Sequence, residues 1–276
     1  MTFPDDALAE HWGLRGAAVR PHHGGMNSAT WFVTHHESRY VAKVAGGWFP
    51  GGIAVADALG RRGFAGGAPV RGTDGRLTVD VGGGQALALL TFVEGAPLTA
   101  HDQHAIGVTL ARVHHLLRDV TVDGEVAMDW VDPHAAHLGL RPWLRDAVAG
   151  AVRDLAAAGP LTEGLLHADP APEAFIGEGL IDWGVAMRGP LLYDVASAVM
   201  YLGGPDAAGP FLAAYTAGGT VPAAELRRAL PVLLRFRFAV QADYFARRIA
   251  TDDLTGIQDA AENEQGLDDA RRGLHR

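Results

Sequence analysis

Residues 165–184 read LLHADPAPEAFIGEGLIDWG and carry the most informative pattern in the chain. Within them, the apolar pairs Phe175-Ile176 and Leu180-Ile181 flank the turn Gly177-Glu178-Gly179, and an aspartate lies beside each pair. This geometry predicts that Asp169 and Asp182 lie in one cleft. There, one carboxylate can accept a proton from an attacking hydroxyl while the other holds a divalent cation on phosphate oxygens. Taken singly, each aspartate is also explained as a turn residue.

Lys43 is the only lysine among the 23 Lys and Arg residues of the chain, and it lies in the apolar run 40–44, YVAKV. A compact ammonium that reaches a phosphate from a strand is not easily replaced by a planar guanidinium. The lone lysine therefore marks a candidate phosphate contact, with chance drift towards arginine as the alternative.

The first 90 residues predict a small sheet with one helix. Trp31–Thr34 and Ser38–Val44 form one expected hairpin, and residues 77–81 and 86–92 form a second across Gly82-Gly83-Gly84. Between the two hairpins, Ile53–Arg62 is expected to form the helix.

After Gly95-Ala96-Pro97 the apolar period becomes helical. Expected helices cover 106–117, 142–158 and 194–202, the last of them capped by Asp194, and a long C-terminal helical region is kinked or divided at Pro231. The chain is therefore expected to hold a β-rich lobe in residues 1–92 and a larger helical lobe in residues 93–276.

Composition narrows the function classes. The chain has 276 residues, no cysteine and a net charge of −9, so disulfides and thiolate sites are excluded. Residues 91–276 hold 15 basic against 25 acidic side chains, which disfavours nucleic acid and favours a cationic ligand, although a solvated acidic surface explains the charge equally well. No apolar run long enough to cross a membrane and no basic leader occurs, so we expect a cytoplasmic protein without membrane contact.

Five features follow one another in a fixed order, and this order resembles the aminoglycoside phosphotransferase and choline kinase family. They are a Gly-rich hairpin, a strand lysine, an apolar connector, His-x-Asp and Ile-Asp-Trp, in residues 24–28, 43, 89–95, 167–169 and 181–183. The likeness runs from Pro21 to Tyr244 and is strongest from Leu165 to Ala196. It implies an α+β, bilobal, protein-kinase-like fold and ATP or GTP with Mg²⁺ as cofactors.

The resemblance also implies roles for particular residues. Asp169 would be the general base or orienter of the acceptor hydroxyl within the motif that His167 begins, and Asp182 would be the principal magnesium ligand. The nucleotide would be bound by the glycine-rich hairpin, the strand lysine and the connector, that is by Gly24, Gly25, Asn27, Ser28, Lys43, Leu90, Phe92 and Val93.

Two departures from the family pattern leave alternatives open. Ala174 stands where the family has a metal-binding Asn, so either Glu173 supplies a carboxylate to the metal or one metal site is lost. The family's helix glutamate that pairs with the strand lysine is also missing. Asp57 is the one carboxylate on the expected helix, and it either pairs with Lys43 or lies on a solvated face.

The function predicted from these features is transfer of the γ-phosphate of ATP or GTP to a hydroxyl of a small polar molecule. Acceptor classes are aminoglycosides, other antibiotics, amino sugars and amino alcohols. A cationic acceptor is suggested by the acidic residues of 251–276. The alternatives are a pseudokinase that binds a nucleotide or ligand without transfer, and a kinase that acts on a peptide Ser or Thr. The protein is expected to act as a monomer or homodimer.

Overall fold

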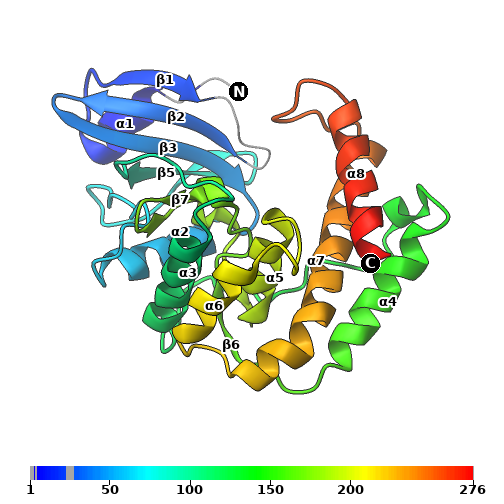
Figure 1. The fold of residues 1–276 in the computed structure, drawn as a ribbon. Helices are drawn as coiled ribbons and strands as arrows, with labels where there is room; N and C mark the ends of the chain where they lie inside the picture. The colour runs from blue at the N-terminus through cyan, green and yellow to red at the C-terminus, as the bar shows by residue number, and fades with distance from the viewer. Residues whose placement is uncertain (1–2, 4, 23–27, 276) are drawn as a thin grey trace.

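The computed structural model describes residues 3, 5–22 and 28–275. It is an α+β structure in which a sheet of the N-terminal lobe adjoins a larger helical lobe (Figure 1). The strands are β1 (Ala18–His22), β2 (Ala29–His35), β3 (Ser38–Gly46), β4 (Val79–Gly82), β5 (Gln85–Thr91), β6 (Glu163–Leu166), β7 (Phe175–Ile176), β8 (Gly179–Leu180) and β9 (Met187–Pro190). The α-helices are α1 (Asp5–Trp12), α2 (Phe49–Gly60), α3 (Gln103–Leu117), α4 (Leu144–Ala156), α5 (Leu192–Tyr201), α6 (Gly209–Ala217), α7 (Ala223–Ala250) and α8 (Ala261–Leu274).

The N-terminal sheet has the strand order β1-β2-β3-β5-β4, and each neighbouring pair is antiparallel. Both hairpins predicted from the sequence are confirmed, because β2 pairs with β3 and β4 pairs with β5. Lys43 lies on the central strand, opposite Thr30 of β2 and Ala88 of β5. The lone lysine is therefore held in the middle of the sheet, where neighbouring strands restrain its backbone on both sides.

The two faces of the sheet have different coverings. Trp31, Val33, Ala42 and Val44 are buried on one face, in a cluster that includes Leu8 and Trp12 of α1. Since successive side chains of a strand alternate between faces, Lys43 belongs to the opposite face. The sequence pattern did not predict α1, which is short and contributes few apolar residues. This helix closes the outer face and leaves the lysine face turned to the rest of the molecule.

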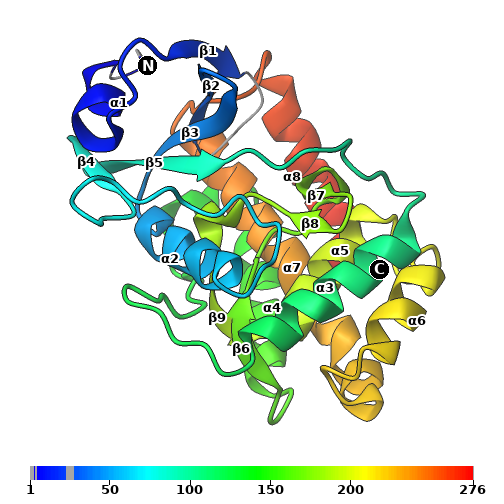
Figure 2. The same cartoon turned by 90° about the vertical axis from the view of Figure 1, so that its left-hand side faces the viewer.

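Helix α2 connects the sheet to the helical lobe (Figure 2). It begins at Phe49, one turn before the predicted start at Ile53, and ends at Gly60, two residues before the predicted end at Arg62. A Cβ atom at Gly52 would clash with the carbonyl oxygen of Trp183, so glycine permits close packing against the turn that follows Asp182. Helix α2 is thus fixed directly against one of the two predicted site segments.

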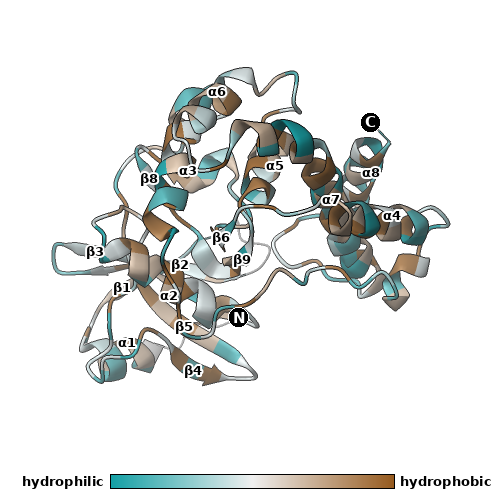
Figure 3. Cartoon of the chain, turned by 90° about the horizontal axis from the view of Figure 1, so that it is seen from below, coloured by the Kyte–Doolittle hydropathy of each residue, from teal (hydrophilic) through white to brown (hydrophobic). Residues whose placement is uncertain are grey.

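The helical lobe is built around α7, a helix of 28 residues that packs against α4, α5 and α8. The sequence predicted a kink or a division at Pro231; the helix is continuous through this residue, so the division is wrong. Pro231 is exposed, and the hydrogen bond that its missing N–H would make is lost on the solvent side. Viewed from below, the sheet and the α4–α7–α8 group lie on opposite sides of the molecule (Figure 3).

None of the helices in the described ranges has the length and apolar character needed to cross a membrane.

Candidate active site

The segment after β6 forms the centre of the site. Leu165 and Leu166 are buried in the β6–β9 pair, and His167 is 1% exposed. Ala168 has a φ of +74°, a left-handed conformation that is costly for alanine and turns the chain sharply before Asp169. The Nε2 atom of His167 lies 2.8 Å from the carbonyl oxygen of Ile181. This hydrogen bond joins the two segments that the sequence predicted to share a cleft.

Asp194 holds the backbone of this turn. Its Oδ2 atom accepts a hydrogen bond from the amide of His167 at 2.8 Å, and its Oδ1 atom accepts one from the amide of Ala168 at 2.7 Å. His114 lies 3.0 Å from Oδ2, and its other ring nitrogen lies 2.8 Å from the hydroxyl of Tyr215. Asp194 is fully buried. The left-handed turn is therefore stabilised from inside the core.

This arrangement corrects the predicted role of Asp194. The sequence favoured a helix cap, but α5 begins at Leu192, and Asp194 lies in its first turn. Its two carboxylate oxygens accept hydrogen bonds from backbone amides of the neighbouring loop and not from those of its own helix. A charged group buried at this depth needs such partners, because an unsatisfied carboxylate would be far more costly.

Asp169 itself is held by two side chains from the helical lobe. Its Oδ1 atom accepts a hydrogen bond from the hydroxyl of Tyr201 at 2.6 Å and another from Nη2 of Arg237 at 3.0 Å. The side chain of Asp169 is 39% exposed, whereas that of Arg237 is 8% exposed. Desolvation by the surrounding protein and the charge of Asp169 raise the pKa of Tyr201. Tyr201 therefore keeps its proton and acts as a donor to Asp169.

Asp182 contacts the lone lysine directly. The Nζ atom of Lys43 donates a hydrogen bond to Oδ1 of Asp182 at 2.6 Å, and the Asp182 side chain is 57% exposed. Asp182 has a φ of +73°, a further left-handed residue at the site. Desolvation acts to raise the pKa of this carboxylate, but the Lys43 ammonium, with a smaller contribution from His167, outweighs it and holds the pKa below its ordinary value.

Asp57 adopts neither arrangement considered from the sequence. It is buried, and its carboxylate pairs with Arg61 at 3.0 Å and with Arg71 at 2.7 Å. Lys43 reaches Asp182 instead. Because Asp57 lies near the C-terminal end of α2, it faces guanidinium groups, while the N-terminal turn of α2 packs beside Asp182. The carboxylate partner of the lysine is thus the predicted metal ligand and not a helix residue.

The lysine face of the sheet continues into an apolar and aromatic surface. Val41 lies opposite Phe32 on β2 and Leu90 on β5. Phe92 is 6.0 Å from Phe32 between ring centroids, and β5 ends one residue before Phe92. The backbone of Phe92 and Val93 therefore lies outside the sheet ladder. A flat aromatic base could lie against this surface, with the Phe92–Val93 backbone beside its edge.

Of the predicted glycine-rich hairpin, the structure describes Ser28. Gly24, Gly25 and Asn27 lie outside the described residues. Ser28 is partly buried, and its hydroxyl lies 3.4 Å from that of Thr30. Since Thr30 is opposite Lys43, Ser28 is placed near the lysine side of the sheet.

The donors available for a metal ion are few. Glu173 is exposed and Ala174 is buried. Within the described ranges, no group of three His, Asp or Glu side chains could hold a metal ion by itself. Mg²⁺ in phosphate-transfer sites is typically bound by one or two carboxylates together with phosphate oxygens and water. The half-exposed carboxylate of Asp182 fits that kind of site.

Three of the seven acidic residues in 251–276 form ion pairs. Asp253 pairs with Arg248 at 3.2 Å, Glu264 pairs with Arg141 at 2.9 Å, and Asp269 pairs with Arg272. Glu262 and Asp259 accept backbone amides at the start of α8. The other four, Asp252, Asp259, Glu262 and Asp268, form no ion pair with a described residue and keep their negative charge.

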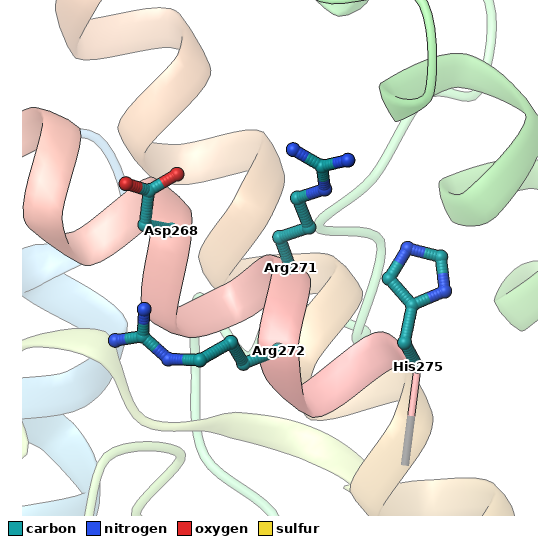
Figure 4. Close-up of a pocket in the computed structure, with 4 residues that line it drawn as sticks. All are labelled: Asp268, Arg271, Arg272 and His275. Atoms are coloured by element: carbon teal, nitrogen blue, oxygen red, sulfur yellow. The ribbon is translucent and has the colours of Figure 1, made fainter.

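An open hollow on α8 lies apart from the site. Its lining is one aspartate, two arginines and one histidine, namely Asp268, Arg271, Arg272 and His275 (Figure 4). None of these residues contacts Lys43, Asp169 or Asp182 through a hydrogen bond or ion pair in the described structure.

Comparison with known proteins identifies the family. The model of the phosphotransferase enzyme family (APH) matches residues 18–231, which include the sheet, the His167 turn, Asp182 and Asp194. The chain belongs to this family. The APH assignment agrees with the resemblance seen in the sequence and with the bilobal fold. No curated protein sequence matches the chain.

Solved structures of several kinases share the APH fold. A microcompartment-associated aminopropanol kinase has a TM-score of 0.76 and 18% identity, covering 98% of this chain and 94% of that one. The amicoumacin kinase hAmiN, in complex with AMP-PNP, Ca²⁺ and Ami, has a TM-score of 0.71 and 16% identity, covering 98% and 90%. A choline/ethanolamine kinase family protein from Mesorhizobium loti has a TM-score of 0.70 and 16% identity, covering 99% and 94%.

Sequence reasoning missed the residues that support the site from the core and from α7. Arg237 is the clearest example. It lies seven residues after Leu230 and four after Leu233, at apolar positions of one helix face, yet it is charged. A buried-face arginine on an amphipathic helix requires a partner, and this signal could have suggested a role near a carboxylate.

Proposed function

We propose that this protein transfers the γ-phosphoryl group of ATP or GTP, with Mg²⁺, to a hydroxyl of a small polar molecule. The observation that carries the proposal is the contact of Lys43 with Asp182 across the two lobes, beside a second aspartate held by its own supports. A strand lysine, a metal-binding aspartate and an acceptor-side aspartate are the parts that phosphoryl transfer needs.

The nucleotide side lies between the sheet and the segment around Asp182. The base would lie against Phe32 and Leu90, with the backbone of Phe92–Val93 along its edge, and Ser28 would lie towards the phosphates. We place the lobe boundary after Phe92 on this ground. The AMP-PNP complex of amicoumacin kinase supports a nucleoside triphosphate as the donor.

Lys43 changes partner when the nucleotide binds. Its ammonium is released from Asp182 and contacts the α- and β-phosphate oxygens, since phosphate carries more negative charge than one carboxylate. Asp182 is then free to hold Mg²⁺. When bound, the metal neutralises charge on the phosphate oxygens, and Asp182 with the phosphates supplies the hard oxygen donors it prefers.

Asp169 acts on the acceptor. The acceptor oxygen forms a bond to the γ-phosphorus, the bond between that phosphorus and the bridging oxygen breaks, and the nucleoside diphosphate leaves with the electron pair. The hydroxyl proton passes to the Asp169 carboxylate, which also orients the hydroxyl before transfer. Positioning supplies most of the rate enhancement, because little covalent chemistry is required of the protein.

The acceptor class is a small hydroxyl compound, such as an amino alcohol, an amino sugar or an antibiotic. The names of the structural neighbours, which include aminopropanol, amicoumacin and choline/ethanolamine kinases, support small acceptors that bear both hydroxyl and amino groups. Three acidic residues near the C-terminus, Asp253, Glu264 and Asp269, form ion pairs, so these three give no separate support for a polycationic acceptor.

The test is a coupled nucleotide-consumption screen across aminoglycosides, other antibiotics, amino sugars and amino alcohols, with ATP and GTP. An acceptor that stimulates turnover in the wild type should fail to do so in Lys43→Ala and Asp169→Ala. Stimulated turnover that is unchanged in both variants would overturn the proposed function.

A further inference from the structure

Asp169 has an asymmetric set of contacts. Both side-chain hydrogen bonds, from Tyr201 at 2.6 Å and from Arg237 at 3.0 Å, end on Oδ1. Among the described residues, no side-chain or backbone donor is recorded on Oδ2. The side chain of Asp169 is 39% exposed, so the carboxylate is open to a ligand, and Oδ2 is the oxygen that no described protein group engages.

The donors that engage Oδ1 are themselves fixed. Ser197 and Tyr201 are four residues apart on α5 and so share one helix face. The Nε atom of Arg237 donates to the Ser197 hydroxyl at 2.7 Å, and Nη2 lies 3.2 Å from the Tyr201 hydroxyl. The guanidinium is thus held at both Nε and Nη2, and its planar donor geometry sets the direction of the hydrogen bond to Asp169.

Two donors on one oxygen restrict the rotation of a carboxylate. The terminal torsion of aspartate is otherwise broad, so an unsupported Asp169 would present either oxygen over a wide range of angles. Reaction geometry tolerates little of this freedom, because a displacement of about 1 Å can lower a rate by a factor of about 10². Arg237 also balances the charge of Asp169 close to where negatively charged phosphates must approach.

We propose that Arg237 and Tyr201 are positioning residues for phosphoryl transfer, which together hold Oδ1 of Asp169 so that Oδ2 faces the acceptor hydroxyl. This inference rests on the proposed function. It assigns a role in the reaction to a buried arginine of α7 that lies 68 residues from Asp169 in the sequence. Ser197 takes part indirectly, by orienting the guanidinium.

If Arg237 and Tyr201 position Asp169, their substitution should lower kcat and leave the KM for nucleotide nearly unchanged. Nucleotide contacts are supplied by the sheet and the segment around Asp182, whereas Arg237 and Tyr201 contact the acceptor-side carboxylate. Arg237→Met keeps the length of the side chain and should lower kcat about 10- to 100-fold with little change in the nucleotide KM. Arg237→Lys restores the charge and a donor that can reach Asp169, but not the donor to Ser197, and should recover part of the loss.

Tyr201→Phe gives a second measurement that does not depend on replacing a buried charge. Tyr201 is 37% exposed, so deleting its hydroxyl leaves the fold intact. We expect kcat to fall about 5- to 10-fold, in line with the loss of one hydrogen bond to a charged group. Arg235→Met is the matched control, since Arg235 lies on the same helix but pairs with Asp154 of α4. Its kcat should equal that of the wild type.

The closing experiment is a double-mutant cycle on kcat with an acceptor found in the screen. It compares the wild type, Asp169→Asn, Arg237→Met, Tyr201→Phe and both double variants containing Asp169→Asn. If Arg237 and Tyr201 act through Asp169, their substitutions should have no further effect on kcat in the Asp169→Asn background. A purely structural role would lower kcat equally in both backgrounds.

The outcomes separate the two proposals. A large loss in Asp169→Asn together with wild-type kcat in Tyr201→Phe and Arg237→Met would overturn this inference and leave the proposed function standing. Equal losses in the two backgrounds would overturn the inference in the same way. Unchanged turnover in Asp169→Asn would overturn the proposed function and the inference that rests on it.

Discussion

The two carboxylates of the site are supported by different parts of the molecule. Asp169 is bound by Tyr201 and Arg237 within the helical lobe, on a turn that the buried Asp194 holds in place. Asp182 instead reaches across to Lys43 on the sheet and is more than half exposed. The proposed acceptor side is therefore held within one lobe, whereas the proposed nucleotide side is assembled between two lobes, where a ligand would compete for Lys43.

The largest expected effect comes from Asp182→Asn, which removes the charge of the candidate metal ligand. Turnover should fall about 10³-fold or more, because the amide binds Mg²⁺ weakly and the charge on the phosphates is no longer balanced. Steady-state kinetics across a range of Mg²⁺ concentrations measures the loss. Glu178→Gln is the control, since this exposed acidic residue lies in the neighbouring β7–β8 turn and pairs only with Arg112 in the described structure. A similar loss in both variants would contradict a metal role for Asp182.

Asp194→Asn tests the proposed acceptor side. The amide nitrogen of Asn cannot accept a backbone N–H, so one of the two amide contacts to His167 and Ala168 is lost in a fully buried place. The free energy of unfolding should fall by about 2–4 kcal/mol, measured by urea denaturation. Protein that remains folded should bind nucleotide normally but turn over slowly. Unchanged stability would show that the turn does not depend on this carboxylate.

Substitutions of Lys43 test the contact between Lys43 and Asp182 that joins the two lobes. Lys43→Met should lower kcat/KM for the nucleotide about 10²-fold, because a contact between opposite charges on the phosphates is lost. Lys43→Arg should do no better, since the wider guanidinium does not fit the place of a lysine side chain that is only 13% exposed. Wild-type kinetics in Lys43→Arg would show that either cationic side chain suffices at this position and that a lysine is not specifically required.

The smallest expected effect is a change with pH in the free energy of unfolding. The pKa of Asp182 is held below its ordinary value of 3.8, so the ion pair stabilises the fold above about pH 3.8 and loses this contribution as the pH falls through the folded-state value. Because Asp182 is more than a third exposed, the contribution is below about 1 kcal/mol. The free energy of unfolding of Lys43→Met should approach that of the wild type as the pH is lowered below 4. A difference that stays constant with pH would contradict the assignment.

The sequence predicted the local parts of this architecture well. The two hairpins follow from alternating β-branched and aromatic residues around glycine-containing turns, and both are present. Lys43, Asp169 and Asp182 were identified because their order along the chain is itself a signal. The structure brings Lys43 to Asp182 and joins the Asp169 and Asp182 segments through His167.

Tertiary pairings could not be predicted from the sequence. The sequence left Asp57 either as a partner for Lys43 or on a solvated face, but the close packing of Gly52 against Trp183 brings Asp182 within reach of Lys43 instead. Similarly, Arg237 meets Asp169 only because α7 packs against α5. Such contacts depend on how elements pack, and no local pattern encodes them.

The central claim is that Lys43 and Asp182 together form a metal-dependent nucleotide site. A thermal-shift titration with ATP, in the presence of Mg²⁺ and in its absence with EDTA, tests it most directly. We predict that ATP raises the Tm of the wild type strongly with Mg²⁺ and weakly without it, and that Asp182→Asn abolishes the difference. Equal stabilisation with and without Mg²⁺ would contradict the claim and would favour a module that binds nucleotide without transferring phosphate.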